Sequence, residues 1–233
     1  MSEEKVPASE LSQALQNCSL FAGMREDQLQ QIAVQTDRLH ASRGQLVIVH
    51  GDPTTDMYFL LSGSVIGQII AENGREILFT EIGQNGYFGE LAALDNRARS
   101  ITISAGADCV FAKLSKERFL KILHEFPEVG INLARDLVGQ LRNMNERVFG
   151  LIAHDVETRV RVRVMQLAQA QEQLVEGGII RNTPTHEMMA GYVGSNREAV
   201  SRAIAKLNKA GVIESERKKI VIRDLRQLLA MEC

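Results

Sequence analysis

Cysteine is scarce in this chain of 233 residues: the three that occur, Cys18, Cys109 and Cys233, are far apart. Their odd number and their spacing match neither a disulfide framework nor a zinc site, so we expect a reducing compartment and no metal. Long apolar runs are also missing, since no stretch approaches the roughly 20 residues of a membrane span. The opening MSEEKVPASE lacks the basic start and apolar core of a signal peptide. These absences predict a cytoplasmic protein that does not contact a membrane.

The rest of the composition is typical of a globular protein, with 45% hydrophobic and 24% charged residues. The length fits one large or two ordinary domains. The formal net charge of -2 is small, but charges of each sign are unevenly distributed along the chain.

Different patterns follow one another along the chain. Residues 10–36 have apolar anchors at helical spacing. Residues 43–114 contain short β-rich runs, such as MYFLLSGSVIGQII and RSITISA, separated by glycine turns, as in a β-barrel or jelly roll. After residue 115 the pattern is helical again, so the predicted fold class is α+β.

Residues 134–151 place apolar side chains at alternating steps of three and four, which is typical of the seam between two helices. The members of this predicted seam are Ala134, Leu137, Leu141, Met144, Val148 and Leu151. A helix that packs on its own domain would have the same spacing. Charged residues on both flanks of the seam favour a dimer interface.

The remainder of the chain predicts a winged helix-turn-helix. A helix capped by Thr185 is followed by Gly194, which allows a sharp turn, and by a second helix over residues 195–209. Two short apolar runs around the polar turn ESERKK then predict a β-hairpin. The predicted domains are a β-rich domain over residues 1–128, a dimerisation helix over 129–154 and a DNA-binding domain over 155–233.

Basic side chains cluster on the second helix and the hairpin, where they outnumber the local acids. Such a patch on a chain that is acidic overall is what binding to a phosphate backbone needs, although a solvated charged face is the alternative. The basic residues of this patch are Arg197, Arg202, Lys206, Lys209, Arg217, Lys218 and Lys219.

The segment FGELAALDNRARS at residues 88–100, the heptad helix and the segment VGSNREAVSRAIAKL together resemble the cyclic-AMP receptor protein/FNR superfamily of bacterial transcription regulators. The resemblance covers about residues 20–222. It implies a β-jelly-roll cyclic-nucleotide-binding domain, a long dimerisation helix and a winged helix-turn-helix domain. It also implies a homodimer that binds double-stranded DNA, a cyclic nucleotide as allosteric ligand, and RNA polymerase. No catalytic constellation accompanies these motifs, so we expect no enzyme.

FGEL, with an arginine nine residues after its glutamate, is similar to the phosphate-binding cassette of this superfamily. The resemblance implies that a helical turn at Gly89 presents backbone N–H groups to the cyclic phosphate, which Arg99 neutralises. Glu90 would accept a hydrogen bond from the ribose 2′-OH. A direct pair between Glu90 and Arg99 is the alternative. The expected ligand-binding residues are Gly89, Glu90, Leu91, Ala92, Arg99, Ser100 and Asn145.

Two adjacent hydroxyl residues that contact the base in this superfamily correspond here to Met144 and Asn145. Asn145 can donate to and accept from a purine edge, whereas Met144 cannot replace a hydroxyl. We therefore expect cyclic AMP or cyclic GMP, with an empty pocket or another effector such as cyclic di-GMP as alternatives. Cys18 alone cannot hold an iron-sulfur cluster, and a lone histidine such as His50 is more often a polar surface residue than a haem ligand.

In the second helix of the motif, Arg197, Glu198 and Arg202 match the residues that read a TGTGA-type half-site in this superfamily. Arginine can bind guanine O6 and N7, and glutamate can accept from cytosine N4. Ser195 and Glu198 also fit a capping box, which is an alternative role for the acid. The lysines expected to contact phosphates only are Lys206, Lys209, Lys218 and Lys219.

Overall fold

The computed structural model describes residues 3–4, 8–71 and 76–230, which form two compact units. One unit comprises residues up to 142 except 72–77, and the other comprises 72–77 and the residues from 143 onward. Within the described ranges, no helix is long and apolar enough to cross a membrane, and no group of histidine, cysteine and acidic side chains could hold a metal ion. Cys18 and Cys109 are buried and free, while Cys233 lies outside the described residues.

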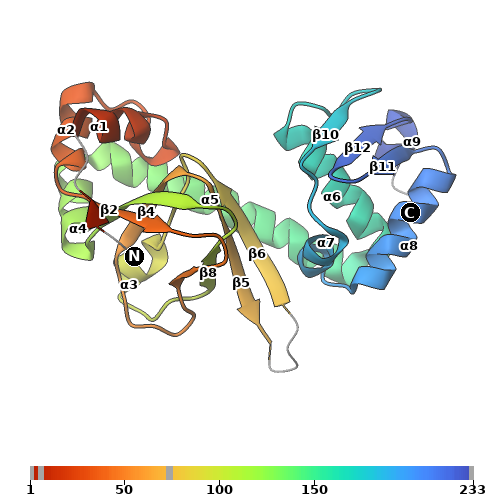
Figure 1. Ribbon diagram of the computed structural model, residues 1–233, viewed down its shortest axis with the longest axis horizontal. Coiled ribbons are helices and arrows are strands. Elements are labelled where there is room, and N and C mark those ends of the chain that lie inside the picture. Colours follow the sequence, from red (N-terminus) through yellow and green to blue (C-terminus); the bar gives the residue numbers. More distant parts are fainter. Residues whose placement is uncertain (1–2, 5–7, 72–75, 231–233) are drawn as a thin grey trace. The chain divides into compact units, whose positions relative to one another are not determined.

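Two sheets form the body of the first unit (Figure 1). The larger has the order β1-β2-β9-β4-β7, and the smaller has the order β3-β8-β5-β6. Their strands are β1 (Glu3–Glu4), β2 (Asp37–Ala41), β3 (Leu46–Ile48), β4 (Met57–Ser62), β5 (Ser64–Ile70), β6 (Glu76–Gly83), β7 (Tyr87–Phe88), β8 (Thr102–Ala105) and β9 (Cys109–Leu114). This confirms the β-rich domain expected from the glycine-separated runs. The sheet begins earlier than expected because β2 buries only Leu39 and Ala41 and so has a weak apolar pattern.

Strand β4 separates two hydrophobic cores, because successive side chains of a strand point to opposite faces. Met57 and Phe59 pack with the helices of this unit, whereas Tyr58 and Leu60 pack between the two sheets. All four side chains are buried, so β4 and its neighbours form a rigid base for the segments that follow them.

Helices cover the outer face of the larger sheet, where α1, α2, α4 and the start of α5 share one core with β4 and β9 (Figure 1). The helices are α1 (Ala8–Gln16), the 3-10 turn η1 (Ser19–Phe21), α2 (Glu26–Ala33), α3 (Glu90–Asp95), α4 (Lys116–Glu125) and α5 (Pro127–Ala153). Helix α5 is 27 residues long and begins with proline, which is favoured at a first helical position. Val129 and Leu133 attach its first turns to the core of this unit.

The second unit has the predicted winged helix-turn-helix pattern. Its elements are α6 (Val156–Ala170), β10 (Ile179–Arg181), α7 (His186–Val193), α8 (Arg197–Lys209), β11 (Ile213–Glu216), β12 (Lys219–Ile222) and α9 (Leu225–Leu229). The strand order is β10-β12-β11, so the predicted hairpin gains a third strand too short to stand out in the sequence. Asp155 caps α6, since its side chain accepts a hydrogen bond from the Thr158 N–H at 2.8 Å.

The first helix of the motif begins and ends where the sequence indicates. Thr185 Oγ1 accepts from the Met188 N–H at 3.2 Å, and Gly194 ends α7 with a φ of 65°. A Cβ atom at position 194 would lie 2.6 Å from Cδ2 of Leu151, so the end of α5 also approaches this turn closely. Leu151, a member of the predicted seam, therefore packs partly against its own chain.

The second helix begins at Arg197 and not at residue 195, because Asn196 Oδ1 caps it by accepting from the Ala199 N–H at 2.8 Å. Glu198 is thus the second residue of the helix, one position short of the third residue that a capping box requires. The capping box of Ser195 with Glu198, which was the alternative role for this acid, is therefore not formed.

Candidate effector and DNA-binding sites

Arg99 is the most deeply buried charged side chain of the cassette, with 3% of its surface exposed. Its Nε donates to Thr54 Oγ1 at 3.0 Å, and its terminal nitrogens donate to the carbonyls of Gly89 at 3.1 Å and Asp56 at 2.7 Å. Its backbone N–H donates to the Asp52 carbonyl at 2.9 Å. The loop before β4 and the residue before α3 therefore hold the guanidinium in one position.

This buried guanidinium has no ion-pair partner among the residues that the structure describes. Glu90, with 8% exposed, has none there either, so the alternative of a direct Glu90–Arg99 pair is not observed. A guanidinium has five N–H groups. Three of them are used by the contacts above, and within the described chain the second N–H of each terminal nitrogen meets no acceptor.

Burial shifts the pKa values of both charged groups, Arg99 and Glu90. Desolvation lowers the pKa of the Arg99 guanidinium from its usual value, against the attraction of Tyr58 and several carboxylates. Desolvation raises the pKa of the Glu90 carboxyl, although backbone hydrogen bonds at Glu90 and Gly89 and the charge of Arg99 oppose the rise. Two opposite charges are thus held in the same buried region without neutralising each other directly.

The backbone at Gly89 brings these groups together. Its φ of 93° lies in the left-handed region, and α3 begins at the next residue. A Cβ atom at this position would lie 2.6 Å from the Asp56 carbonyl oxygen and 2.9 Å from Nη1 of Arg99. Only glycine therefore allows the cassette to pass so close to the arginine.

The other predicted ligand-binding residues have different environments. Ala92 is buried, whereas Leu91 and Ser100 are exposed. Asn145 is exposed on the part of α5 that belongs to the second unit, so its place in the effector site stays a prediction. Thr54 and Asp56, which hold Arg99, were not found from the sequence because they act through a hydroxyl and a backbone carbonyl in an ordinary polar loop.

The residues predicted to read bases lie exposed on the surface of α8. Arg197, Glu198 and Arg202 are exposed, and their side chains have no hydrogen-bond or ion-pair partner in the described ranges. Arg202 and Lys209 are seven positions apart and therefore lie on the same side of the helix. The side chains needed for direct contact with base edges are thus available.

The hairpin lysines differ from each other. Lys218 is exposed at the tip, with a φ of 59°. Lys219 is half-buried and pairs with Glu216 at 2.9 Å. Because Glu216 is exposed, this pair contributes little to stability, so a phosphate can compete for Lys219.

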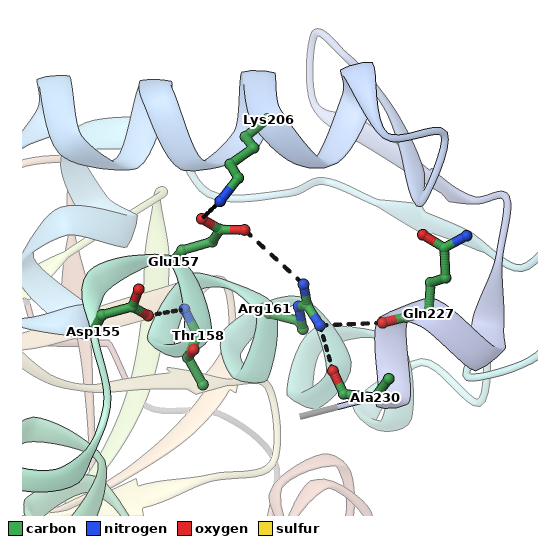
Figure 2. A network of polar contacts seen from close by, with 7 residues as sticks. All are labelled: Asp155, Glu157, Thr158, Arg161, Lys206, Gln227 and Ala230. Atoms are coloured by element: carbon green, nitrogen blue, oxygen red, sulfur yellow. Dashed lines mark hydrogen bonds and ion pairs between the residues drawn. The ribbon is translucent and has the colours of Figure 1, made fainter. Parts of the chain in front are cut away.

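Lys206 belongs to a polar network at the start of α6 (Figure 2). Its Nζ lies 2.6 Å from Oε2 of Glu157, whose Oε1 lies 4.0 Å from Arg161. Arg161 donates in turn to the carbonyls of Gln227, at 3.2 Å, and Ala230. The network joins α8, α6 and the end of α9.

Helix α5 has two unlike sides. Leu137, expected in the seam, is only partly exposed and packs against the core of the first unit. The exposed large apolar side chains of the helix are Ile131, Val138, Leu141, Met144, Val148, Phe149, Leu151 and Ile152. An exposed stripe with alternating steps of three and four therefore runs through residues 131, 134, 138, 141, 145, 148 and 152. It lies to one side of the predicted seam, and Asn145 is one of its members.

Comparison with known proteins agrees with this arrangement. Residues 38–126 match the cyclic nucleotide-binding domain, and residues 158–231 match the Crp-like helix-turn-helix domain. The CRP-like cAMP-activated global transcriptional regulator of Mycobacterium tuberculosis is 30% identical over 220 residues, which cover 94% of this chain and 98% of that protein. This chain belongs to the CRP/FNR family of transcription regulators. As a CRP/FNR protein, it is a DNA-binding regulator and not an enzyme.

Other CRP/FNR proteins are similar over most of the chain. The cAMP-activated global transcriptional regulator CRP of Haemophilus influenzae is 27% identical over 186 residues, covering 79% of this chain and 83% of that protein. The structure of the c-di-GMP responsive global regulator CLP of Xanthomonas campestris has a TM-score of 0.74 at 21% identity, covering 85% of this chain and 99% of that one. The fold is therefore shared with a regulator described as responding to a different nucleotide.

Proposed function

We propose that this regulator is a homodimer whose DNA affinity is raised by a cyclic nucleotide bound beside Gly89, Glu90 and Arg99. The observation that carries the proposal is the buried charge of Arg99, which has no ion-pair partner among the described residues. A buried charge without a partner is costly, and a cyclic phosphodiester supplies one compact anion for the two remaining N–H groups. Glu90 then accepts a hydrogen bond from the ribose 2′-OH, and Ser100 donates to a phosphate oxygen.

Cyclic AMP and cyclic GMP are the first candidates for the nucleotide. The Mycobacterium and Haemophilus relatives are described as cAMP-activated. Asn145 can pair with the edge of either purine, because its amide is both donor and acceptor. Cyclic di-GMP, named for the Xanthomonas regulator, is the second candidate, since Met144 stands where the family's base-contacting hydroxyl is expected.

Dimerisation is proposed through the exposed stripe of α5. Val138, Leu141 and Val148 would be buried between two parallel copies of the helix, with Asn145 among them. A polar residue at such a position can contact the nucleotide base and the helix of the other subunit. Ligand binding can change DNA affinity only if it favours one arrangement of the dimer over another. Asn145 is the residue proposed to connect ligand binding with the arrangement of the dimer.

The DNA target is proposed to be a palindrome of TGTGA-like half-sites. Arg197 and Arg202 would bind guanines, and Glu198, which is free of a capping role, would accept from a cytosine N4 amino group. Lys209, Lys218 and Lys219 would contact phosphates. A regulator acting in this way works in the cytoplasm and contacts RNA polymerase at its promoters.

Two measurements on the full chain test the proposal. Calorimetry with cyclic AMP, cyclic GMP and cyclic di-GMP identifies the nucleotide, and selection from a random DNA library with and without it identifies the target. We expect one nucleotide to bind and to raise affinity for a palindromic consensus. If no nucleotide binds, or if saturating nucleotide leaves DNA affinity unchanged, the gating is wrong.

A further inference from the structure

Lys206 lies on the same stripe of α8 as Arg202 and Lys209, but it pairs with a carboxylate of its own chain. Glu157 Oε2 is 2.6 Å from its Nζ, and Lys206 is also among the charges that lower the pKa of Asp155, after the hydrogen bonds from Thr158. Both acids lie at the beginning of α6, where the helix dipole favours negative charge. Figure 2 shows the Lys206 side chain reaching from α8 to Glu157.

The carboxylate of Glu157 is held in place on its other side. Only 23% of its side chain is exposed, and Arg161 lies 4.0 Å from its second oxygen. Arg161 is itself fixed by the backbone carbonyls of Gln227 and Ala230. The acid is therefore held from two sides, whereas Lys206 is largely exposed, with 70% of its side chain accessible to solvent.

Lys209 is a natural comparison, since it is three positions further along the same helix. It is also exposed, but its ammonium has no partner among the described residues. On one face of the helix, Lys206 is therefore paired with an acid, whereas Lys209 has no such pair within the described residues. A phosphate that approached Lys206 would also approach Glu157, and the repulsion between the two anions would cancel much of the attraction.

We propose that Glu157 withholds Lys206 from the DNA backbone, and so removes one phosphate contact per subunit from sequence-independent DNA binding. The inference rests on the proposed role of α8 as the reading helix. Glu157 is a positioning residue in this account, because it touches Lys206 and not the DNA. Its effect is a limit on non-specific affinity that leaves base preference unchanged.

The salt dependence of DNA binding tests this inference on the full-length protein. Each phosphate contact adds about 0.9 to the slope of log affinity against log salt concentration, which is about threefold in affinity between roughly 50 and 200 mM salt. The probe is a random-sequence duplex. We expect Lys209→Gln to flatten the slope by about 0.9 per bound subunit, and Lys206→Gln to leave it unchanged.

Removing the acid should release the lysine. Glu157→Gln should steepen the slope by about 0.9 per subunit, and the double variant Glu157→Gln with Lys206→Gln should return it to the wild-type value. Library selection with Glu157→Gln should give the wild-type consensus. A purely structural role for Glu157 predicts a lower unfolding temperature and weaker binding with no change in slope.

The inference is overturned if Lys206→Gln flattens the wild-type slope as much as Lys209→Gln does. That comparison uses only surface substitutions and does not depend on how well Glu157→Gln folds. An unchanged slope in a folded Glu157→Gln protein would overturn it as well. If the wild type binds no duplex under any condition, the proposed function fails and the inference fails with it.

Discussion

The hydroxyl of Tyr87 donates a hydrogen bond to Oδ2 of Asp136 at 2.9 Å, and Ser19 donates to the same oxygen at 2.8 Å. Tyr87 lies in β7, two residues before Gly89, and Asp136 lies on α5. Burial, followed by the interaction with Asp136, raises the pKa of Tyr87 far above its ordinary value, so this hydroxyl stays protonated and remains a donor. The strand that leads into the cassette is thus tied to the helix proposed to form the dimer.

The first prediction concerns this link. Tyr87→Phe removes the hydroxyl but keeps the ring, so we expect the free energy of unfolding to fall by about 1–2 kcal/mol, as for a hydrogen bond to a charged acceptor. The factor by which nucleotide raises DNA affinity should also fall. Denaturant unfolding and DNA titration measure the two effects. Tyr58→Phe is the control, because the Tyr58 hydroxyl of the neighbouring strand has no hydrogen-bond partner in the described chain; equal effects of the two variants would contradict the link.

The second prediction concerns the anion site. Arg99→Ala should weaken nucleotide binding by at least about 2 kcal/mol, because it removes a charge-assisted partner of a buried phosphate. Arg99→Lys should recover little of this, since an ammonium lacks the planar fork. Glu90→Ala should weaken binding by less. Lys113→Ala is the control, as it removes the half-buried ion-pair partner of Asp56 at 3.1 Å. Calorimetry that finds wild-type affinity in Arg99→Ala would disprove the cassette.

The third prediction concerns assembly. Leu141→Glu would place a charge in the apolar stripe of α5, where burial of an unpaired carboxylate is costly. We expect sedimentation to show monomers at concentrations where the wild type is dimeric. Val34→Glu, at another exposed apolar position, should leave the dimer intact. An intact dimer in Leu141→Glu would place the interface elsewhere.

The fourth prediction separates base reading from phosphate contact. Arg202→Ala should lose about 1–3 kcal/mol on the preferred site and relax the preference at one guanine. Lys218→Ala should weaken all sequences alike and flatten the salt dependence by about 0.9 per subunit. Selection from a DNA library measures the first effect, and salt titration measures the second. An equally sharp consensus from Arg202→Ala would show that Arg202 does not read a base.

The fifth prediction concerns alkaline stability. Burial raises the pKa of the Cys18 thiol from 9.0 to about 11, so the folded state keeps a proton that the unfolded state loses. The resulting stabilisation is complete below pH 9.0 and is lost as the pH rises towards 11. Its size is about 2–3 kcal/mol at most. Cys18→Ala should therefore show a smaller loss of unfolding free energy than the wild type between pH 9 and 10, below the range in which Tyr87 contributes. Parallel pH profiles of the two proteins would contradict the assignment.

Much of the architecture could be predicted because its signals are local. The continuous apolar run in MYFLLS reflects the two cores on either side of β4, and Thr185 and Gly194 mark the ends of α7 as its capping residues. The start of α8 was misread, although Asn196 is as good a capping residue as Ser195. The motif S-x-x-E indicated Ser195 as the capping residue, whereas Asn196 caps the helix.

The heptad pattern of α5 fits two alternative interfaces. Two sets of positions on this helix have alternating steps of three and four, and both contain Leu141 and Val148. Spacing alone cannot say which set faces another chain. Leu137 packs on the core of the first unit, which favours the other set, and that set contains Asn145. Met144 and Leu151 of the predicted seam are exposed as well, so the interface stays a prediction.

The sequence by itself determined the order of the domains, the glycine that lets the cassette turn, and the residues that α8 presents. These follow from backbone conformation and periodicity, which depend on near neighbours. Only the tertiary structure decided which groups the charged side chains contact. Arg99 is held by the Thr54 hydroxyl and the Asp56 carbonyl and pairs with no carboxylate of the described chain, and Lys206 is bound by Glu157, 49 residues away. The partner of a long charged side chain is set by which elements pack beside it, and no local pattern contains that information.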